Sequence, residues 1–170
     1  GREETTTLCL IPAVREATTL PLIAAGGIGT GEAIFALMAL GAEGVQMGTR
    51  FALTDESSAS DIFKEYCLRL NEGDTKLLLK KLAPTRLVIN SFRDRVEAAE
   101  GRGASAEELR ELLGRGRAKK GIFEGDLEEG ELEIGQVAAL FRRRQSVDEV
   151  MKELLEGYRR ASDKIRSAGL

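Results

Sequence analysis

The stretch that decides the fold is Leu20–Phe51, which reads LPLIAAGGIGTGEAIFALMALGAEGVQMGTRF. Its apolar run at residues 20–25 is typical of a strand buried on both faces of a parallel sheet, and the glycines at 26–29 end it. A helical segment at 30–40 and a second strand at 44–47 follow, with the short connections that βα units require. The pattern predicts two parallel strands that each end in a glycine-rich turn.

These two glycine turns are candidates for an anion site. Glycine lets the backbone approach a phosphate closely, and the start of a helix adds oriented N–H groups. The first turn offers Gly26, Gly27 and Ile28, and the second offers Gly48 and Thr49 one βα unit later. In (β/α)8 barrels the loops after the last two strands are a frequent phosphate site. The alternative is that Gly26 and Gly27 only allow tight packing beneath a loop.

Composition excludes several classes of partner. The chain has 170 residues and a net charge of −3, so it carries no global basic field to attract nucleic acid. No apolar run approaches the roughly 20 residues of a membrane span, and we therefore expect no membrane partner and a cytoplasmic location. The two cysteines, Cys9 and Cys67, lie far apart in the sequence and are expected to be free thiols.

The rest of the chain is mostly helix and loop. We expect helices at 5–18, 60–70, 91–100, 105–113, 136–144 and 146–165, extended segments at 76–82 and 85–90, and an acidic loop at 121–135. Two strands cannot close an eight-stranded barrel, so the residues alone indicate part of an α/β protein with a helical C-terminal region.

The segments AAGGI, at Ala24–Ile28, and GAEGVQMGTRF, at Gly41–Phe51, resemble the nitronate monooxygenase family, formerly called 2-nitropropane dioxygenases. That family includes the FMN-dependent enoyl-acyl-carrier-protein reductases. The resemblance continues through GREETTTLCLIPAV and GDLEEGELEIGQVAAL, and covers nearly the whole chain. It implies an FMN-binding TIM barrel, of which this chain supplies the last two strands, followed by a mostly helical added domain. The domains that the resemblance implies are a barrel end at 1–55, a mostly helical added domain with an extended linker at 56–134, and C-terminal helices at 135–170 that pack back on the barrel.

The resemblance also implies roles for single residues. Gly26 and Gly27, with Ile28 beside them, and Gly48 with Thr49 would hold the FMN phosphate. Gln46 and Met47 would end barrel strand eight beside the flavin. The list of cofactor residues that the resemblance implies is therefore Gly26, Gly27, Ile28, Gln46, Met47, Gly48 and Thr49.

No histidine is present in the chain. The family's catalytic His lies in the segment E-A-G-G-H-x-G, immediately before the threonine-rich helix, and Gly1 looks like the last glycine of that segment. We therefore expect a C-terminal fragment with no catalytic residue of its own. The activity implied for the whole protein is oxidation of alkyl nitronates by O₂ through reduced flavin.

Three alternatives remain open at this stage. One is an NAD(P)H-dependent enoyl-acyl-carrier-protein reductase of the same family. Another is an IMP-dehydrogenase-like enzyme, which holds a nucleotide substrate's phosphate on similar turns without a flavin. The last is a non-catalytic half-barrel subunit or interaction module that associates with a partner or a second copy through its exposed barrel edges.

A few further residues have two interpretations each. Gln136 matches the family's A-G-Q element and would reach the substrate mouth through its amide, or it only caps a helix. Arg50 adds charge to the phosphate or, as we prefer, pairs with a surface carboxylate. Arg86 and Asn90 are expected to be structural. The acidic loop lacks calcium-loop spacing, so we expect no metal site there, only a solvated loop.

Overall fold

The computed structural model describes residues 5–169, which fold into two compact units. We call residues 5–56 and 145–169 the glycine-turn unit, and residues 57–144 the hairpin unit. The expected domain boundary at 55/56 lies beside the division after Glu56, whereas residues 135–144 lie in the hairpin unit. No helix in the described range is long and apolar enough to cross a membrane.

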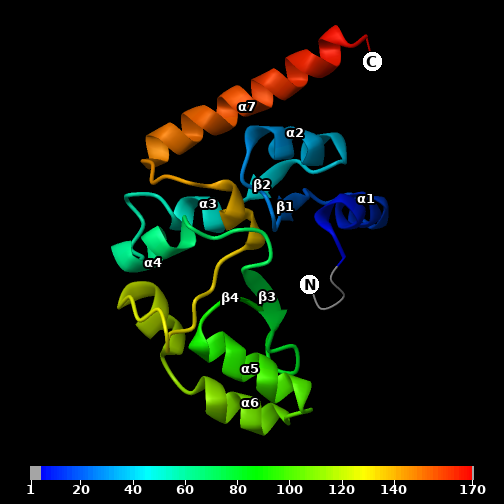
Figure 1. The fold of residues 1–170 in the computed structure, drawn as a ribbon. Helices are drawn as coiled ribbons and strands as arrows, with labels where there is room; N and C mark the ends of the chain where they lie inside the picture. The colour runs from blue at the N-terminus through cyan, green and yellow to red at the C-terminus, as the bar shows by residue number, and fades with distance from the viewer. Residues whose placement is uncertain (1–4, 170) are drawn as a thin grey trace. The chain divides into compact units, whose positions relative to one another are not determined.

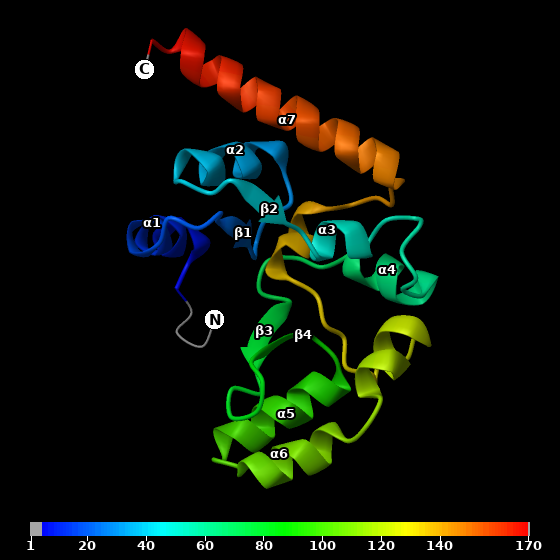
Figure 2. The same ribbon diagram turned by 180° about the vertical axis from the view of Figure 1, so that it is seen from behind.

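The glycine-turn unit places a small parallel sheet among helices (Figures 1 and 2). Its elements are α1 (Thr7–Ala17), β1 (Ile23–Ala25), α2 (Gly31–Ala39), β2 (Gly44–Gln46), α3 (Thr49–Ala52) and α7 (Val147–Ser167). β1 and β2 pair in parallel, with Ala24 opposite Val45 and Ala25 opposite Gln46. The buried core beside this sheet consists of Ile11, Ala24, Ile28, Leu37 and Ala42. The chain is thus mixed α/β, as the sequence predicts.

The expectation of a first strand buried on both faces is wrong for these residues. β1 is only three residues long, and Ala24 alone is buried in it. Leu20 and Ile23 are 70% and 56% exposed. Within the described chain β1 pairs with one strand, β2, so its other edge is unpaired.

Local signals at the helix ends explain where α2 and α7 begin. The Thr30 side chain accepts a hydrogen bond from the Ala33 N–H at 3.2 Å and caps α2. Ser146 and Glu149 form the predicted capping box at the start of α7. At the start of α1, Thr6 occupies the cap position without a side-chain hydrogen bond, and Pro12 lies inside the helix.

The hairpin unit is built on an antiparallel β-hairpin, β3 (Thr75–Leu78) with β4 (Thr85–Val88). Its other elements are α4 (Asp61–Cys67), α5 (Ser91–Gly101), α6 (Ala106–Leu113), a π-helical turn η1 (Lys119–Phe123) and a 3-10 helix η2 (Gln136–Leu140). The two expected extended segments are therefore strands. Their core contains Leu78, Leu79, Leu87, Phe92, Val96, Ala99, Ala104 and Leu109.

Two expectations in the hairpin unit are wrong. The predicted helix at 136–144 is a 3-10 helix that ends at Leu140, because Phe141 is extended and the Arg142 side chain donates to the Leu70 carbonyl at 2.6 Å. The predicted loop at 121–135 begins inside η1. There the Ser60 N–H donates to the Ile122 carbonyl at 2.8 Å, which ties this turn to the start of α4.

Candidate anion site at two glycine turns

The parallel pairing of β1 and β2 brings the two glycine turns to one edge of the sheet. Ala25 and Gln46 are partners at the ends of the two strands. The next residues, Gly26-Gly27-Ile28 and Met47-Gly48-Thr49, therefore leave neighbouring strands in the same direction. This is the arrangement that the sequence predicts for an anion site, and Gly26, Gly27, Gln46 and Gly48 are all exposed there.

The space around the glycines distinguishes a role in ligand binding from a role in close packing. A β-carbon on Gly27 or on Gly48 would meet no heavy atom within 4 Å. A β-carbon on Gly26 would meet only the Thr7 hydroxyl, at 4.0 Å. These glycines are thus not needed for close packing within the described chain, which gives the interpretation of Gly26 and Gly27 as packing glycines no support there.

Backbone conformation accounts for two of the three open glycines. Gly26 has φ +95° and Gly27 has φ +71°, a region that residues with side chains rarely adopt. Gly48 has φ −88° and ψ −62°, which any residue tolerates. Gly48 therefore has neither a conformational nor a packing reason to be glycine within the described residues. A bare backbone at this place is what the close approach of a bound group requires.

The first turn is held from both sides. The Thr7 hydroxyl donates to the Gly26 carbonyl at 3.0 Å, which links the start of α1 to the turn. Ile28 is 3% exposed and anchors the turn in the core. Sequence reasoning missed this contact, since no local pattern indicates a bond across 19 residues.

Arg50 forms polar contacts with Gln145, just before α7, and with Glu153 of α7. Its Nη2 donates to Gln145 Oε1 at 2.9 Å and to Glu153 Oε2 at 2.5 Å. Pairing with a carboxylate was the preferred interpretation, and the structure confirms it. The guanidinium is buried rather than on the surface, and no local pattern indicates its partners, which are 95 and 103 residues away.

One acidic side chain lies near the first turn. Glu32 is in the first turn of α2, and its carboxylate forms an ion pair with Arg160 of α7 at 3.1 Å. A hydrogen bond from its own backbone N–H, followed by Arg160, lowers the pKa of this carboxyl. The Arg160 cation offsets a negative charge that would otherwise oppose an anion at the start of α2.

Gln136 belongs to the hairpin unit, where it is the first residue of η2 and is exposed. The cap position of η2 belongs to Gly135, so the helix-cap interpretation of Gln136 is wrong. Met47 and Thr49 are half-buried at the second turn. Among the described residues no group of three His, Cys, Asp or Glu side chains is placed to hold a metal ion.

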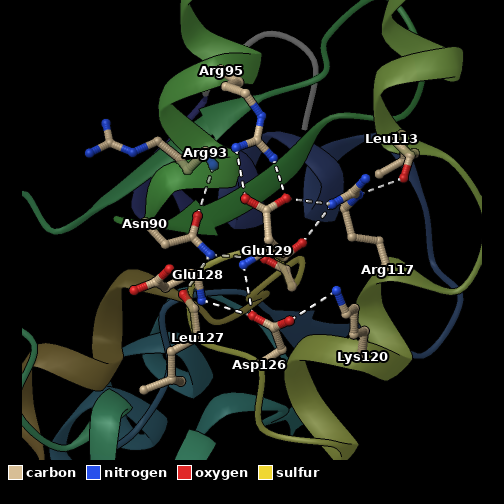
Figure 3. A network of polar contacts seen from close by, with 11 residues as sticks. Asn90, Arg93, Arg95, Leu113, Arg117, Lys120, Asp126, Leu127, Glu128 and Glu129 are labelled. Atoms are coloured by element: carbon tan, nitrogen blue, oxygen red, sulfur yellow. Dashed lines mark hydrogen bonds and ion pairs between the residues drawn. The ribbon is translucent and has the colours of Figure 1, made fainter.

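The acidic loop is ordered by ion pairs instead of being merely solvated (Figure 3). Glu129 accepts from Arg95 in a two-pronged pair at 2.9 and 2.6 Å, and its backbone carbonyl accepts from Arg117 at 2.7 Å. The Glu129 N–H and then Lys120 hold the pKa of Asp126 down at about 2. This network stabilises the loop's shape, and its cations are occupied by neighbouring carboxylates.

Comparison with known proteins agrees with this picture. The model of a family described as nitronate monooxygenase matches residues 1–157. A probable nitronate monooxygenase of Staphylococcus aureus (strain JH9) is 39% identical over 98 residues, which make up 56% of this chain and 27% of that protein.

Solved structures extend the similarity to the fold. FabK from Thermotoga maritima matches 97% of this chain and 52% of its own, with a TM-score of 0.89 and 33% identity. A nitroalkane oxidase from Streptomyces ansochromogenes matches 94% of this chain and 45% of its own, with a TM-score of 0.72 and 29% identity. The chain therefore spans about half the length of these two solved chains.

Proposed function

Because the chain belongs to the nitronate monooxygenase family, we propose that it supplies the cofactor-phosphate site of an FMN-dependent oxidoreductase. Gly26, Gly27 and Ile28 form the first half of this site. The second half consists of Gln46, Met47, Gly48 and Thr49. Both halves leave one edge of the β1–β2 pair, which supports their acting on one ligand.

The observation that carries this proposal is the glycine at position 48. Neither its φ nor its surroundings exclude a side chain, yet the position is bare and exposed next to a second open glycine turn. A phosphate held by backbone N–H groups needs this bareness, since a side chain would separate the anion from the backbone.

In this proposal the residues of the chain bind and orient, and they carry out no chemical step. When bound, FMN supplies the electron-transfer chemistry, and the proposed reaction of the whole protein is oxidation of alkyl nitronates by O₂. The two turns would hold the phosphate end of the cofactor and so limit how far the rest of it can reach. The chain has no histidine, and we assign no base to its residues.

We also propose that β1 and β2 are the last two strands of a (β/α)8 barrel, with the hairpin unit as an added domain. Parallel pairing with a helix after each strand supports this assignment, since barrels are built from such units. The fold likeness to the two solved chains supports it further.

The test is FMN affinity after a single side chain is added at Gly48. Gly48→Val is expected to weaken FMN binding at least tenfold, because its side chain would separate the anion from the backbone N–H groups, while the β-carbon itself meets no heavy atom within 4 Å. The matched control is Gly101→Val, at another open glycine without positive φ. Flavin fluorescence titration measures the affinity. Absence of FMN binding by the unaltered protein, or equal affinity of Gly48→Val, overturns the proposal.

The same site is compatible with the alternative activity, reduction of enoyl thioesters by NAD(P)H, because the turns would hold only the cofactor. The two activities are separated by assay of the purified holoprotein. O₂ uptake with an alkyl nitronate supports the first. NAD(P)H oxidation that depends on an enoyl thioester, without nitronate turnover, replaces it with the second.

A further inference from the structure

Helix α7 contacts the elements that follow both glycine turns, although it lies about 100 residues further along the chain (Figures 1 and 2). At the second turn the link is Arg50, two residues after Gly48. Its guanidinium, 8% exposed, donates to Gln145 and Glu153, and Gln145 Nε2 donates in turn to Glu153 Oε1 at 2.6 Å. The three side chains thus form a closed polar triangle.

Backbone bonds reinforce this triangle at the start of α7. A parallel bridge joins Thr54 to Gln145, and the Asp55 N–H donates to the Gln145 carbonyl at 3.0 Å. Both carboxylate oxygens of Glu56 accept from the Val147 N–H at 3.0 Å. The segment that leads out of the second glycine turn is therefore tied to α7 at several successive residues.

At the first turn the link is helix on helix. Gly31, the first residue of α2, packs so closely on α7 that a β-carbon there would lie 2.7 Å from the carbonyl carbon of Gly157. Phe35 and Tyr158 meet edge to face with ring centroids 5.6 Å apart. Glu32 and Arg160 add the exposed ion pair across the same interface.

From these contacts we propose that α7 is a positioning element for the phosphate site, and that Arg50, Gln145 and Glu153 are the positioning residues that transmit its effect to Gly48 and Thr49. The inference rests on the proposed function, because it concerns how the two glycine turns are held for the cofactor. None of the three side chains is assigned a contact with FMN.

The physical argument is one of linkage. The two turns bind one ligand well only if their spacing is held, and α7 is the element in contact with both α2 and α3. If docked α7 holds the two turns at the spacing that the ligand needs, docking of α7 strengthens ligand binding. By linkage, the bound ligand then stabilises the docking of α7 by the same free energy. Breaking the triangle removes this coupling at the second turn.

The experiment compares two variants with the same charge change on the same helix. Glu153→Gln removes the carboxylate that pairs with Arg50, and Glu156→Gln removes an exposed carboxylate about one helical turn further along α7. We expect Glu153→Gln to weaken FMN binding about tenfold, within the usual range of coupling between sites, and Glu156→Gln to leave it unchanged. Gln145→Ala is expected to follow Glu153→Gln.

A second readout is independent of enzyme activity. Hydrogen exchange of the backbone amides in residues 147–158 should slow when FMN is added to the unaltered protein, and this protection should be lost in Glu153→Gln. If FMN binds but neither affinity nor exchange responds, the inference is overturned and the proposed function stands. If the unaltered protein does not bind FMN, the proposed function fails. Loss of fold in Glu153→Gln leaves the exchange measurement on the unaltered protein as the deciding one.

Discussion

Gly31 of α2 lies against the backbone of α7 at Gly157, with no room between them for a side chain on Gly31. A β-carbon on Gly31 would collide with the Leu154 carbonyl and lie 2.7 Å from the Gly157 carbonyl carbon, and one on Gly157 would lie 2.7 Å from Glu32 Oε2. Both residues are buried. The interface therefore depends on the absence of a side chain at Gly31, which faces the backbone of α7, whereas Gly157, 126 residues later by number (157 less 31), faces only the end of the flexible Glu32 side chain.

Gly31→Ala is expected to destabilise the protein by about 3 kcal/mol or more, since the obstructing atoms belong to the α7 backbone and not to a flexible side chain. Urea unfolding followed by circular dichroism measures this loss. Gly101→Ala is the control, because its β-carbon meets nothing within 4 Å and it lies in α5, where alanine is favoured. Equal stability of the two variants would contradict the packing argument.

Asn90 offers a second test, in the hairpin unit (Figure 3). Its Oδ1 accepts from the Arg93 N–H at 2.8 Å and caps α5, while its Nδ2 donates to the carbonyls of Leu127 and Gly130 at 3.0 and 2.9 Å. Asn90→Asp keeps the cap and replaces the donor by a charged acceptor that faces two carbonyls. We expect a loss of about 2–3 kcal/mol at neutral pH.

The control for Asn90 is Asn71→Asp, which makes the same change at an exposed residue whose side-chain amide has only a 3.5 Å bond to the Arg69 carbonyl. Thermal unfolding at neutral pH compares the two variants. A melting temperature for Asn90→Asp equal to that of Asn71→Asp would show that the contacts of Nδ2 with the acidic loop contribute nothing.

The two cysteines should differ in reactivity. Both are free, but Cys9 is exposed whereas Cys67 is buried, and burial raises the pKa of the Cys67 thiol to about 12. Because the thiolate is the reactive form, one of the two thiols should react with a disulfide reagent in the native protein and both in denaturant. Cys9→Ser should abolish the native reaction. Persistence of that reaction would place Cys67 within reach of solvent.

Signals that act over a few residues predict much of this fold. The positive φ of Gly41 at the end of α2, the Thr30 cap and the Ser146–Glu149 capping box all rest on neighbours within one helical turn. The glycine turns themselves are local signals as well. These features are decided by backbone sterics and hydrogen bonding that the flanking residues determine.

Features that depend on distant partners were missed or misjudged. The partners of Arg50 are 95 and 103 residues away, and no local pattern selects Gln145 and Glu153 among many polar residues. The helix expected through Arg142 ends at Leu140 because the Arg142 side chain bonds to the distant Leu70 carbonyl. Likewise, an apolar run such as that at residues 20–25 indicates burial without showing which elements provide it.

Glu131 makes stability depend on pH. It is 7% exposed, and burial, with a further contribution from Glu133, raises the pKa of its carboxyl from 4.5 to about 7, while Arg117 lowers it. Between pH 4.5 and 7 the folded protein retains a proton that the unfolded chain has released. Stability therefore falls as pH rises through this window, and the penalty is complete above it.

Glu131→Gln removes the charge that burial disfavours. The variant should be more stable than the unaltered protein at pH values above the window, on the order of 1–2 kcal/mol. This gain is smaller than the free energy that corresponds to the full pKa shift, because solvent near the loop screens the charge. Below the window, where Glu131 is protonated in both states, the gain should vanish. Urea unfolding at several pH values measures the stability gain above and below the window.

The control is Glu128→Gln, which removes an exposed carboxylate of the same loop. The stability difference between this variant and the unaltered protein should not vary across the window. A gain for Glu131→Gln that stays constant with pH would show that the buried carboxyl does not titrate there, and a loss at high pH would show that its charge is stabilised by the fold.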